Sequence, residues 1–237
     1  MSDPTVLDNE ETRMEVEDGG WLILRRPERD ASGATPDAIL TRTAQLPGNW
    51  RLIPGPHGAI ERLAEIPVED EGGEGMDGDR FHRLRAMPAG EESLPPEEVV
   101  TAALDAAGLA WSRREGGWAV PATSDRPGEL RVRRVPGGVR VEAVLVEWDE
   151  AEPKETAGLA RFLFAAQASL RFARCELNSH GACVISHAET VRLETDLGHS
   201  LRAVAAGCRL LTRAARALAA PEVARRYLRF HEAADNG

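Results

Sequence analysis

The sequence predicts an α+β fold, in which amphipathic helices are combined with antiparallel hairpins. Three stretches support this prediction. Between 154 and 194 an amphipathic helix leads into a hairpin, and between 129 and 148 two strand patterns flank the turn Pro136-Gly137-Gly138. A long helical pattern starting at Leu197 closes the chain. Runs of strands with helices packed against them are typical of the α+β class.

Length, charge and cysteine content restrict the possible functions. A chain of 237 residues can bury a substantial core, as one large domain or two small ones. Its formal net charge of -10 argues against binding to nucleic acid or to an anionic membrane surface. No apolar run approaches the roughly 18 residues that a membrane-spanning helix requires. Three cysteines and an acidic start, Met1-Ser2-Asp3-Pro4, predict a cytoplasmic protein without a secretory signal.

The N-terminal part of the chain carries weaker signals than the rest. Residues 1–17 are acidic and polar without a hydrophobic period, and we expect a disordered tail. Residues 18–70 are expected to form a strand-rich unit. Its strand, short helix and hairpin are expected at 20–25, 35–45 and 49–68. Residues 71–92 are dominated by Gly, Asp and Glu, a composition that predicts a solvated linker.

A second domain is expected over residues 93–232, with the element order α-β-β-β-α-β-β-α. Ser93, followed by Pro95 and Pro96, is a typical helix start, and Gly108 ends that helical pattern. Strands are then expected at 110–121, 129–135 and 139–148, with an internal turn at Glu115-Gly116-Gly117. The remaining elements are a helix at 154–170, a hairpin at 172–193, and a helix from Leu197 that Pro221 breaks or restarts.

Two of these elements have a clear buried face. In the helix at 154–170, apolar residues recur at helical spacing: Leu159, Phe162, Leu163, Ala166 and Leu170. This face should be buried, and the following hairpin is the surface expected to receive it. In the strand at 139–148, Val139, Val141, Ala143 and Leu145 share one face, while Arg140 and Glu142 share the other. That alternation predicts a half-buried antiparallel strand.

The hairpin at 172–193 also carries a metal-like spacing, C-x4-H-x2-C-x3-H. It consists of Cys175, His180, Cys183 and His187. A four-residue loop at 178–181 would place Cys175 opposite Val184, so that Cys183 and His187 share the face opposite to Cys175. One tetrahedral zinc cannot collect ligands from both faces of a sheet, so we expect no metal site. A different loop length would shift the register and weaken this objection.

The order of the elements resembles a known fold. The stretch Leu163-Phe164-Ala165-Ala166-Gln167-Ala168 leads into Phe172-Ala173-Arg174-Cys175-Glu176-Leu177 and then Gly181-Ala182-Cys183-Val184-Ile185. Together with the element order over 93–230, this pattern resembles the type III secretion chaperone-like fold, a group that includes the YbjN-type proteins. The resemblance implies an antiparallel sheet of about five strands with helices packed on one face. It also implies binding of another polypeptide, often by a dimer.

The unit at 18–70 is a candidate degenerate second copy, and such an extension departs from simple secretion chaperones. His57-Gly58-Ala59-Ile60 parallels His180-Gly181-Ala182-Cys183, and Asp18-Gly19-Gly20-Trp21 parallels Glu115-Gly116-Gly117-Trp118. If the repeat is real, the two units could form a pseudo-dimer within one chain. In the alternative, residues 18–70 add edge strands to a single sheet.

Two functional hypotheses follow. The first is a non-enzymatic protein- or peptide-binding module, acting as a homodimer or an intrachain pseudo-dimer, without nucleic-acid or membrane partners. The second is a small-molecule enzyme with a cleft between the two units, lined by His57, His180 or His187 and acidic residues. The sequence identifies no catalytic, cofactor-binding or metal-binding residues, and we expect no cofactor.

Overall fold

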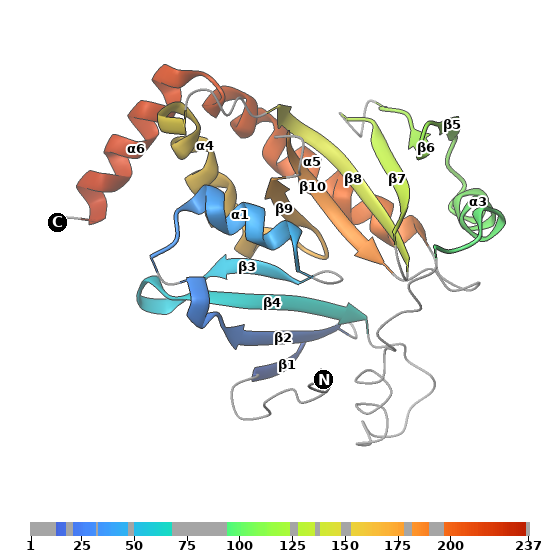
Figure 1. The fold of residues 1–237 in the computed structure, drawn as a ribbon, viewed down its shortest axis with the longest axis horizontal. Helices are drawn as coiled ribbons and strands as arrows, with labels where there is room; N and C mark the ends of the chain where they lie inside the picture. Colours follow the sequence, from blue (N-terminus) through green and yellow to red (C-terminus); the bar gives the residue numbers. More distant parts are fainter. Residues whose placement is uncertain are drawn as a thin grey trace.

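The computed structural model describes residues 13–17, 21–31, 33–46, 50–67, 94–123, 128–135, 138–147, 153–177, 182–189 and 197–235. The protein has the α+β fold that the sequence predicts, with antiparallel strands in two sheets and helices packed between and against them (Figure 1). In the described part of the chain, no helix is long and apolar enough to cross a membrane.

The first sheet has four antiparallel strands in the spatial order β1-β2-β4-β3. Its elements are β1 (Arg13–Glu17), β2 (Trp21–Pro27), the 3-10 turn η1 (Arg29–Ala31), α1 (Pro36–Ala44), β3 (Arg51–Pro54), the 3-10 turn η2 (Pro56–Gly58) and β4 (Ile60–Pro67). The fixed backbone angle of Pro36 suits the first turn of α1. Ile39, Leu40 and Thr43 form the buried face of this helix.

The second sheet has six strands in the order β5-β6-β7-β8-β10-β9, and every neighbouring pair is antiparallel. Its elements are α3 (Glu97–Ala106), β5 (Ser112–Arg114), β6 (Gly117–Val120), β7 (Leu130–Val135), β8 (Gly138–Glu147), α4 (Pro153–Ala166), the 3-10 turn η3 (Gln167–Ser169), β9 (Arg174–Leu177), β10 (Ala182–Glu189), α5 (Leu197–Leu218) and α6 (Pro221–Asp235).

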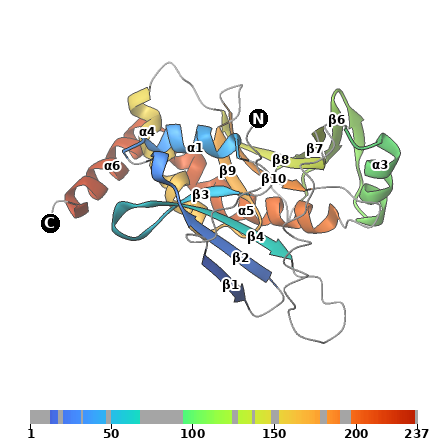
Figure 2. The same ribbon diagram turned by 60° about the horizontal axis from the view of Figure 1, so that its bottom comes forward.

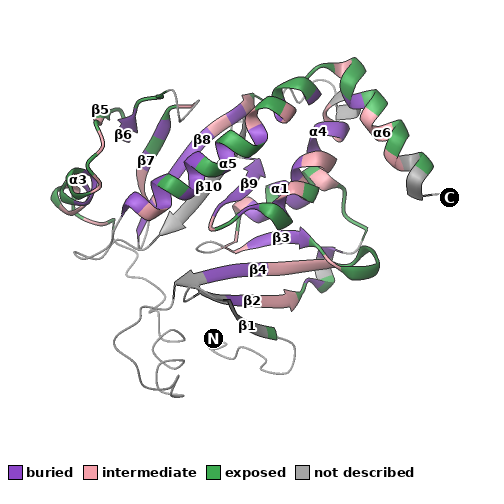
Figure 3. Ribbon diagram, turned by 180° about the vertical axis from the view of Figure 1, so that it is seen from behind, coloured by how far each residue is buried: buried purple, intermediate pink, exposed green. Residues whose placement is uncertain are grey.

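The main core lies between this sheet and α5, which packs against β8 and β10 (Figure 3). Val139, Val141, Ala143 and Leu145 of β8 are buried in this core, as their alternation predicts. On α5, Leu201, Val204, Cys208 and Leu211 face the same core. On the opposite face Arg140 is partly exposed, but Glu142 is buried, because Arg133 and Arg140 both pair with it. The strand is therefore mostly buried on both faces, and the expected half-burial is wrong.

The two sheets meet through their helices. The helix α1 packs against α4 and also against β9 of the other sheet. In the opposite direction, α4 packs against β3 of the first sheet. Figures 1 and 2 show α1 and α4 together at this junction, with the four-stranded sheet on one side. We use the word junction below for the contact of α1 and β3 with α4, η3 and β9.

Several expectations for the strands need correction. Residues 13–17, expected within the disordered tail, form β1, because pairing with β2 satisfies their backbone groups. Residues 21–67 build a sheet of their own rather than edge strands of a single sheet. The second sheet has six strands instead of five, because the turn at Glu115-Gly116 divides the expected strand 110–121 into β5 and β6.

The expectations for the helices need smaller corrections. The helix α4 packs mainly against α6 and α1. Its apolar face also belongs to the core of the hairpin that follows, since Leu159 and Leu163 share one buried cluster with Cys175. The α-helical part of α4 ends at Ala166 and tightens into the 3-10 turn η3. The helix α3 begins at Glu97 after Pro96, while Ser93 and the expected linker 71–92 lie outside the described residues.

Candidate functional site

The edge of the six-stranded sheet at β5 is open among the described residues. Ser112, Arg113 and Arg114 are all exposed, and β5 is the last strand of the sheet on this side. The β5–β6 hairpin turns tightly because Gly116 adopts a positive φ of 77°, which favours glycine. An exposed edge strand presents backbone donors and acceptors with which an extended polypeptide can pair.

An open hollow of about 320 Å³ lies beside this edge. It is lined by Arg114, Glu115, Gly117, Trp118, Glu129, Arg131, Val132 and Arg133. Gly117 allows β6 to approach β7 closely, since a Cβ at this position would lie 2.1 Å from the carbonyl oxygen of Val132. The hollow therefore depends on a residue without a side chain.

The charges around the hollow are only loosely paired. Arg114 and Arg131 each approach the Glu129 carboxylate to 3.9 Å, and their side chains are 65% and 51% exposed. Arg133 pairs more closely with Glu142, at 2.8 Å. Exposed ion pairs contribute little stability, so the guanidinium groups of Arg114 and Arg131 can exchange partners at low cost. Because Arg133 is already paired with Glu142, the loosely held groups that an acidic ligand could meet are the guanidiniums of Arg114 and Arg131.

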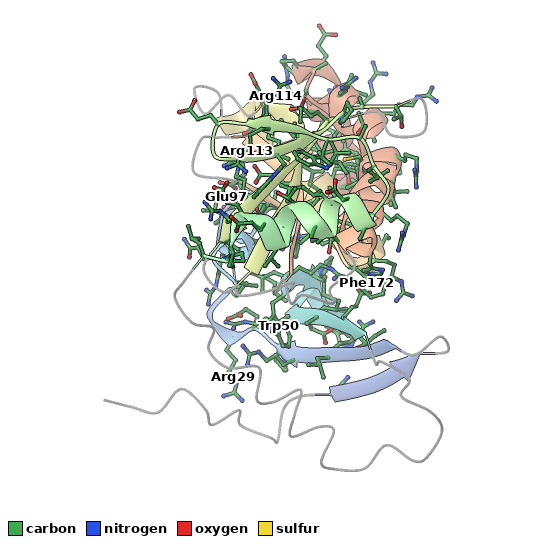
Figure 4. All side chains as sticks on the ribbon, turned by 90° about the vertical axis from the view of Figure 1, so that its right-hand side faces the viewer. Arg29, Trp50, Glu97, Arg113, Arg114 and Phe172 are labelled. Atoms are coloured by element: carbon green, nitrogen blue, oxygen red, sulfur yellow. The ribbon has the colours of Figure 1, made fainter. Side chains whose placement is uncertain are left out.

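The side chain of Arg113 on β5 contacts residues of β6 and α3. The guanidinium of Arg113 lies 4.6 Å from the ring centroid of Trp118, in a cation–π contact. Glu97 of α3 accepts hydrogen bonds from Arg113 at 2.5 Å and from Arg134 at 2.8 Å. Figure 4 shows Glu97 beside Arg113, with Arg114 on the same strand. The pairing of β5 with β6 fixes one edge of the strand, while its outer edge stays exposed.

A second polar cluster lies at the junction and is buried. Arg51, the first residue of β3, donates to the Glu65 carboxylate at 3.0 Å and to the carbonyl oxygens of Gln167 and Leu170 at 3.1 and 2.5 Å. The side chains of Arg51 and Glu65 are 1% and 2% exposed. Burial lowers the pKa of the Arg51 guanidinium, and the nearby Glu65 opposes this shift.

Glu65 also accepts hydrogen bonds from the connection between α4 and β9. Its carboxylate receives the backbone N–H of Phe172 at 2.5 Å and the guanidinium of Arg171 at 3.3 Å. Phe172 has a positive φ of 55°, which costs energy for a residue with a side chain. The Glu65 carboxylate is thus one of the contacts that stabilise this strained turn, together with the edge contact between Phe172 and His199.

Arg174, the first residue of β9, donates hydrogen bonds from the second sheet to the connection between α1 and β3 of the first. It donates to Glu176 at 2.9 Å and to the carbonyl oxygens of Leu46 and Trp50, each at 3.0 Å. Burial, together with repulsion from Arg140, lowers the pKa of the Arg174 guanidinium to about 9. These groups are committed to contacts within the protein, and the junction is a packed interface at these residues.

The hairpin register differs from the register expected for the metal-like pattern. Leu177 pairs with Cys183 and Cys175 pairs with Ile185, because the loop is one residue longer than expected. By strand alternation, Cys175, Cys183 and His187 therefore share one face, and the expected separation onto two faces is wrong. Cys175 is buried in the core, while the side chains of His180, Cys183 and His187 lie outside the described part. Within the described residues, no group of three potential metal ligands occurs.

The other predicted and missed residues are spread over the fold. His57 is exposed in η2, the turn between β3 and β4 of the first sheet. Sequence reasoning missed Arg51, Glu65 and Arg174. Their one signal is a charged residue inside a short, otherwise apolar stretch, as in Arg51-Leu52-Ile53.

No protein-family model matches this chain, and a search of curated proteins found no match.

Proposed function

We propose that the chain is a non-enzymatic protein- or peptide-binding module whose C-terminal part is secretion-chaperone-like. The element order from α3 to α5 supports this proposal, because it matches the order on which the sequence resemblance rests except for one additional strand, where β5 and β6 replace the single strand expected at 110–121. The observation that carries the binding function is the exposed edge strand β5 beside an arginine-rich hollow. We propose that an extended segment with acidic side chains pairs with β5 and places a carboxylate near Arg114 and Arg131.

Among the described residues, no specific observation favours the enzyme hypothesis. At the junction, where the cleft was expected, Arg51 and Arg174 are bonded to carboxylates and backbone carbonyl oxygens. His57 is exposed in the turn between β3 and β4. The proposal therefore rests on the β5 edge.

Fluorescence anisotropy with labelled probe peptides tests the proposal. The acidic probe is Thr-Glu-Val-Glu-Val-Glu-Thr, and the basic probe replaces each glutamate with lysine. We expect the full chain to bind the acidic probe, and the double variant Arg114→Glu/Arg131→Glu to lose at least about tenfold in affinity. The matched control, Arg216→Glu/Arg229→Glu, makes the same charge change at exposed helical positions and should retain binding.

Amide hydrogen exchange locates the binding. The acidic probe should slow exchange at residues 112–114, because backbone pairing protects the amides of an edge strand. No binding of the acidic probe, or an equal loss in both double variants, would refute the proposed edge site.

A further inference from the structure

Both sheets contain the same five-element unit. In the first sheet, β1, β2, α1, β3 and β4 follow one another along the chain, and the spatial order is β1-β2-β4-β3. In the second, β7, β8, α4, β9 and β10 follow one another, and their spatial order is β7-β8-β10-β9. All neighbours in both sets are antiparallel. The β5–β6 hairpin is an addition beyond β7.

The second half of each unit also matches in sequence position. The strands β3 and β9 are both four residues long, and each begins with a buried arginine, Arg51 and Arg174. The shift from 51 to 174 is the same as the shift from 57 to 180. It therefore also relates His57-Gly58-Ala59 to His180-Gly181-Ala182, which lie after these strands. The strands β4 and β10, which come next, are both eight residues long.

The two arginines make reciprocal contacts. Arg51 of the first unit donates to Gln167 and Leu170, in the connection between α4 and β9 of the second unit. Arg174 of the second unit donates to Leu46 and Trp50, in the connection between α1 and β3 of the first unit. Each arginine thus binds the helix-to-strand connection of the other unit, at the equivalent place in the fold.

The packing around the arginines is reciprocal as well. The helix α1 packs on β9, α4 packs on β3, and the two helices pack on each other. In an isologous interface, two copies related by a twofold axis use the same surface. Each contact therefore occurs twice, and an element that lies on the axis meets its own equivalent in the other copy. The contacts of α1, β3, α4 and β9 have this form. The carboxylates break the symmetry, since Glu65 lies on β4 whereas Glu176 lies on β9.

We propose that residues 13–67 and 130–189 are two copies of one unit that form a pseudo-dimer within the chain, closed by the reciprocal contacts of Arg51 and Arg174. The partner of each surface is the other copy, so this surface needs no second chain. The inference is independent of the proposed binding edge at β5, which lies outside both copies.

Cutting the folded chain between the two units tests this proposal. A protease recognition site is inserted between Gly72 and Gly78, and the folded protein is cut and examined by native mass spectrometry and light scattering. The uncut chain should have the mass of one chain. After cutting, the two fragments should stay together in a 1:1 complex, because their shared interface is buried.

The arginines are then compared in the cut protein. Arg51→Met and Arg174→Met should each raise the dissociation constant of the fragments at least about tenfold, because each removes two charge-assisted hydrogen bonds across the interface, buried for Arg51 and part-buried for Arg174. The control is Arg42→Met, which removes a 3.0 Å pair with Glu28 inside the first unit and should leave the dissociation constant within about threefold. If a Met variant does not fold, Arg51→Lys and Arg174→Lys are used instead of the two Met variants. Lysine retains the positive charge but lacks the planar guanidinium group with its several N–H donors.

Three results would overturn the pseudo-dimer. They are separation of the wild-type fragments after cutting, a stable dimer of uncut chains through this surface, and weakening by only one of the two arginine variants.

Discussion

Arg51 and Glu65 form an ion pair almost inaccessible to water. Removing one partner leaves a buried charge without compensation, which typically costs about 3–5 kcal/mol. We expect Glu65→Gln to lower the free energy of unfolding by about 3 kcal/mol in urea, followed by tryptophan fluorescence. Glu61→Gln is the control, because its 3.9 Å pair with Arg25 is partly exposed and should change stability by less than about 1 kcal/mol. Equal losses in the two variants would contradict the role of Glu65.

Cys208 makes stability depend on pH in the alkaline range. Burial raises the pKa of its thiol from 9.0 to about 11, against the opposing charge of Arg209. Between these values the unfolded chain loses a proton that the native protein retains, so stability should fall as pH rises from 9 to 11. The full effect of two pKa units is about 2.7 kcal/mol. Urea melts at pH 8.5 and 10.5 should show a smaller loss in Cys208→Ala than in wild type, and identical losses would exclude this contribution.

At the scale of elements, the crossing of α4 and α6 depends on Gly158. A Cβ at this position would lie 2.8 Å from the carbonyl oxygen of Ala224 and 3.0 Å from its Cα, so α6 would have to move. We expect Gly158→Ala to destabilise the protein by about 1–3 kcal/mol in urea, even though alanine favours a helix more than glycine does. Faster amide exchange in α6 should accompany the loss.

The control for this crossing is Gly128→Ala, where an added Cβ would meet nothing within 4 Å. Its stability should change by less than about 0.5 kcal/mol. A stabilising effect of Gly158→Ala would mean that helix propensity outweighs the close approach.

Elements set by local signals could be predicted from the sequence, and pairings set by distant contacts could not. The buried apolar face of β8 and the start of α1 at Pro36 depend on adjacent residues, and both agree with the structure. The burial of Glu142 on the other face depends on its ion pairs with Arg133 and Arg140. The β9–β10 register was predicted wrongly because one extra loop residue reverses which side chains share a face. Arg51 and Arg174 escaped prediction because their burial depends on carbonyl oxygens more than 110 positions away.

At the scale of the whole molecule, the buried junction should make the two sheets unfold together. Arg51, Glu65 and Arg174 all form hydrogen bonds across the junction. Unfolding of the first sheet alone would therefore leave buried charges on the second sheet without their partners. We expect the slowest amides of β4 and β8 to exchange with the same free energy of opening in native-state hydrogen exchange. A markedly lower value for β4 would show that the first sheet unfolds independently.

The two edges of the six-stranded sheet carry different aggregation hazards. The strand β5 is short and carries two exposed arginines, which discourage uncontrolled strand pairing between molecules. The other edge strand, β9, is completely buried, and α1 packs against it. Displacing the first unit would uncover β9 as an unpaired edge strand, on which Arg174 and Glu176 are paired with each other. The contacts of Arg174 with Leu46 and Trp50 keep the first unit on β9. They therefore also prevent self-association of the folded protein through β9.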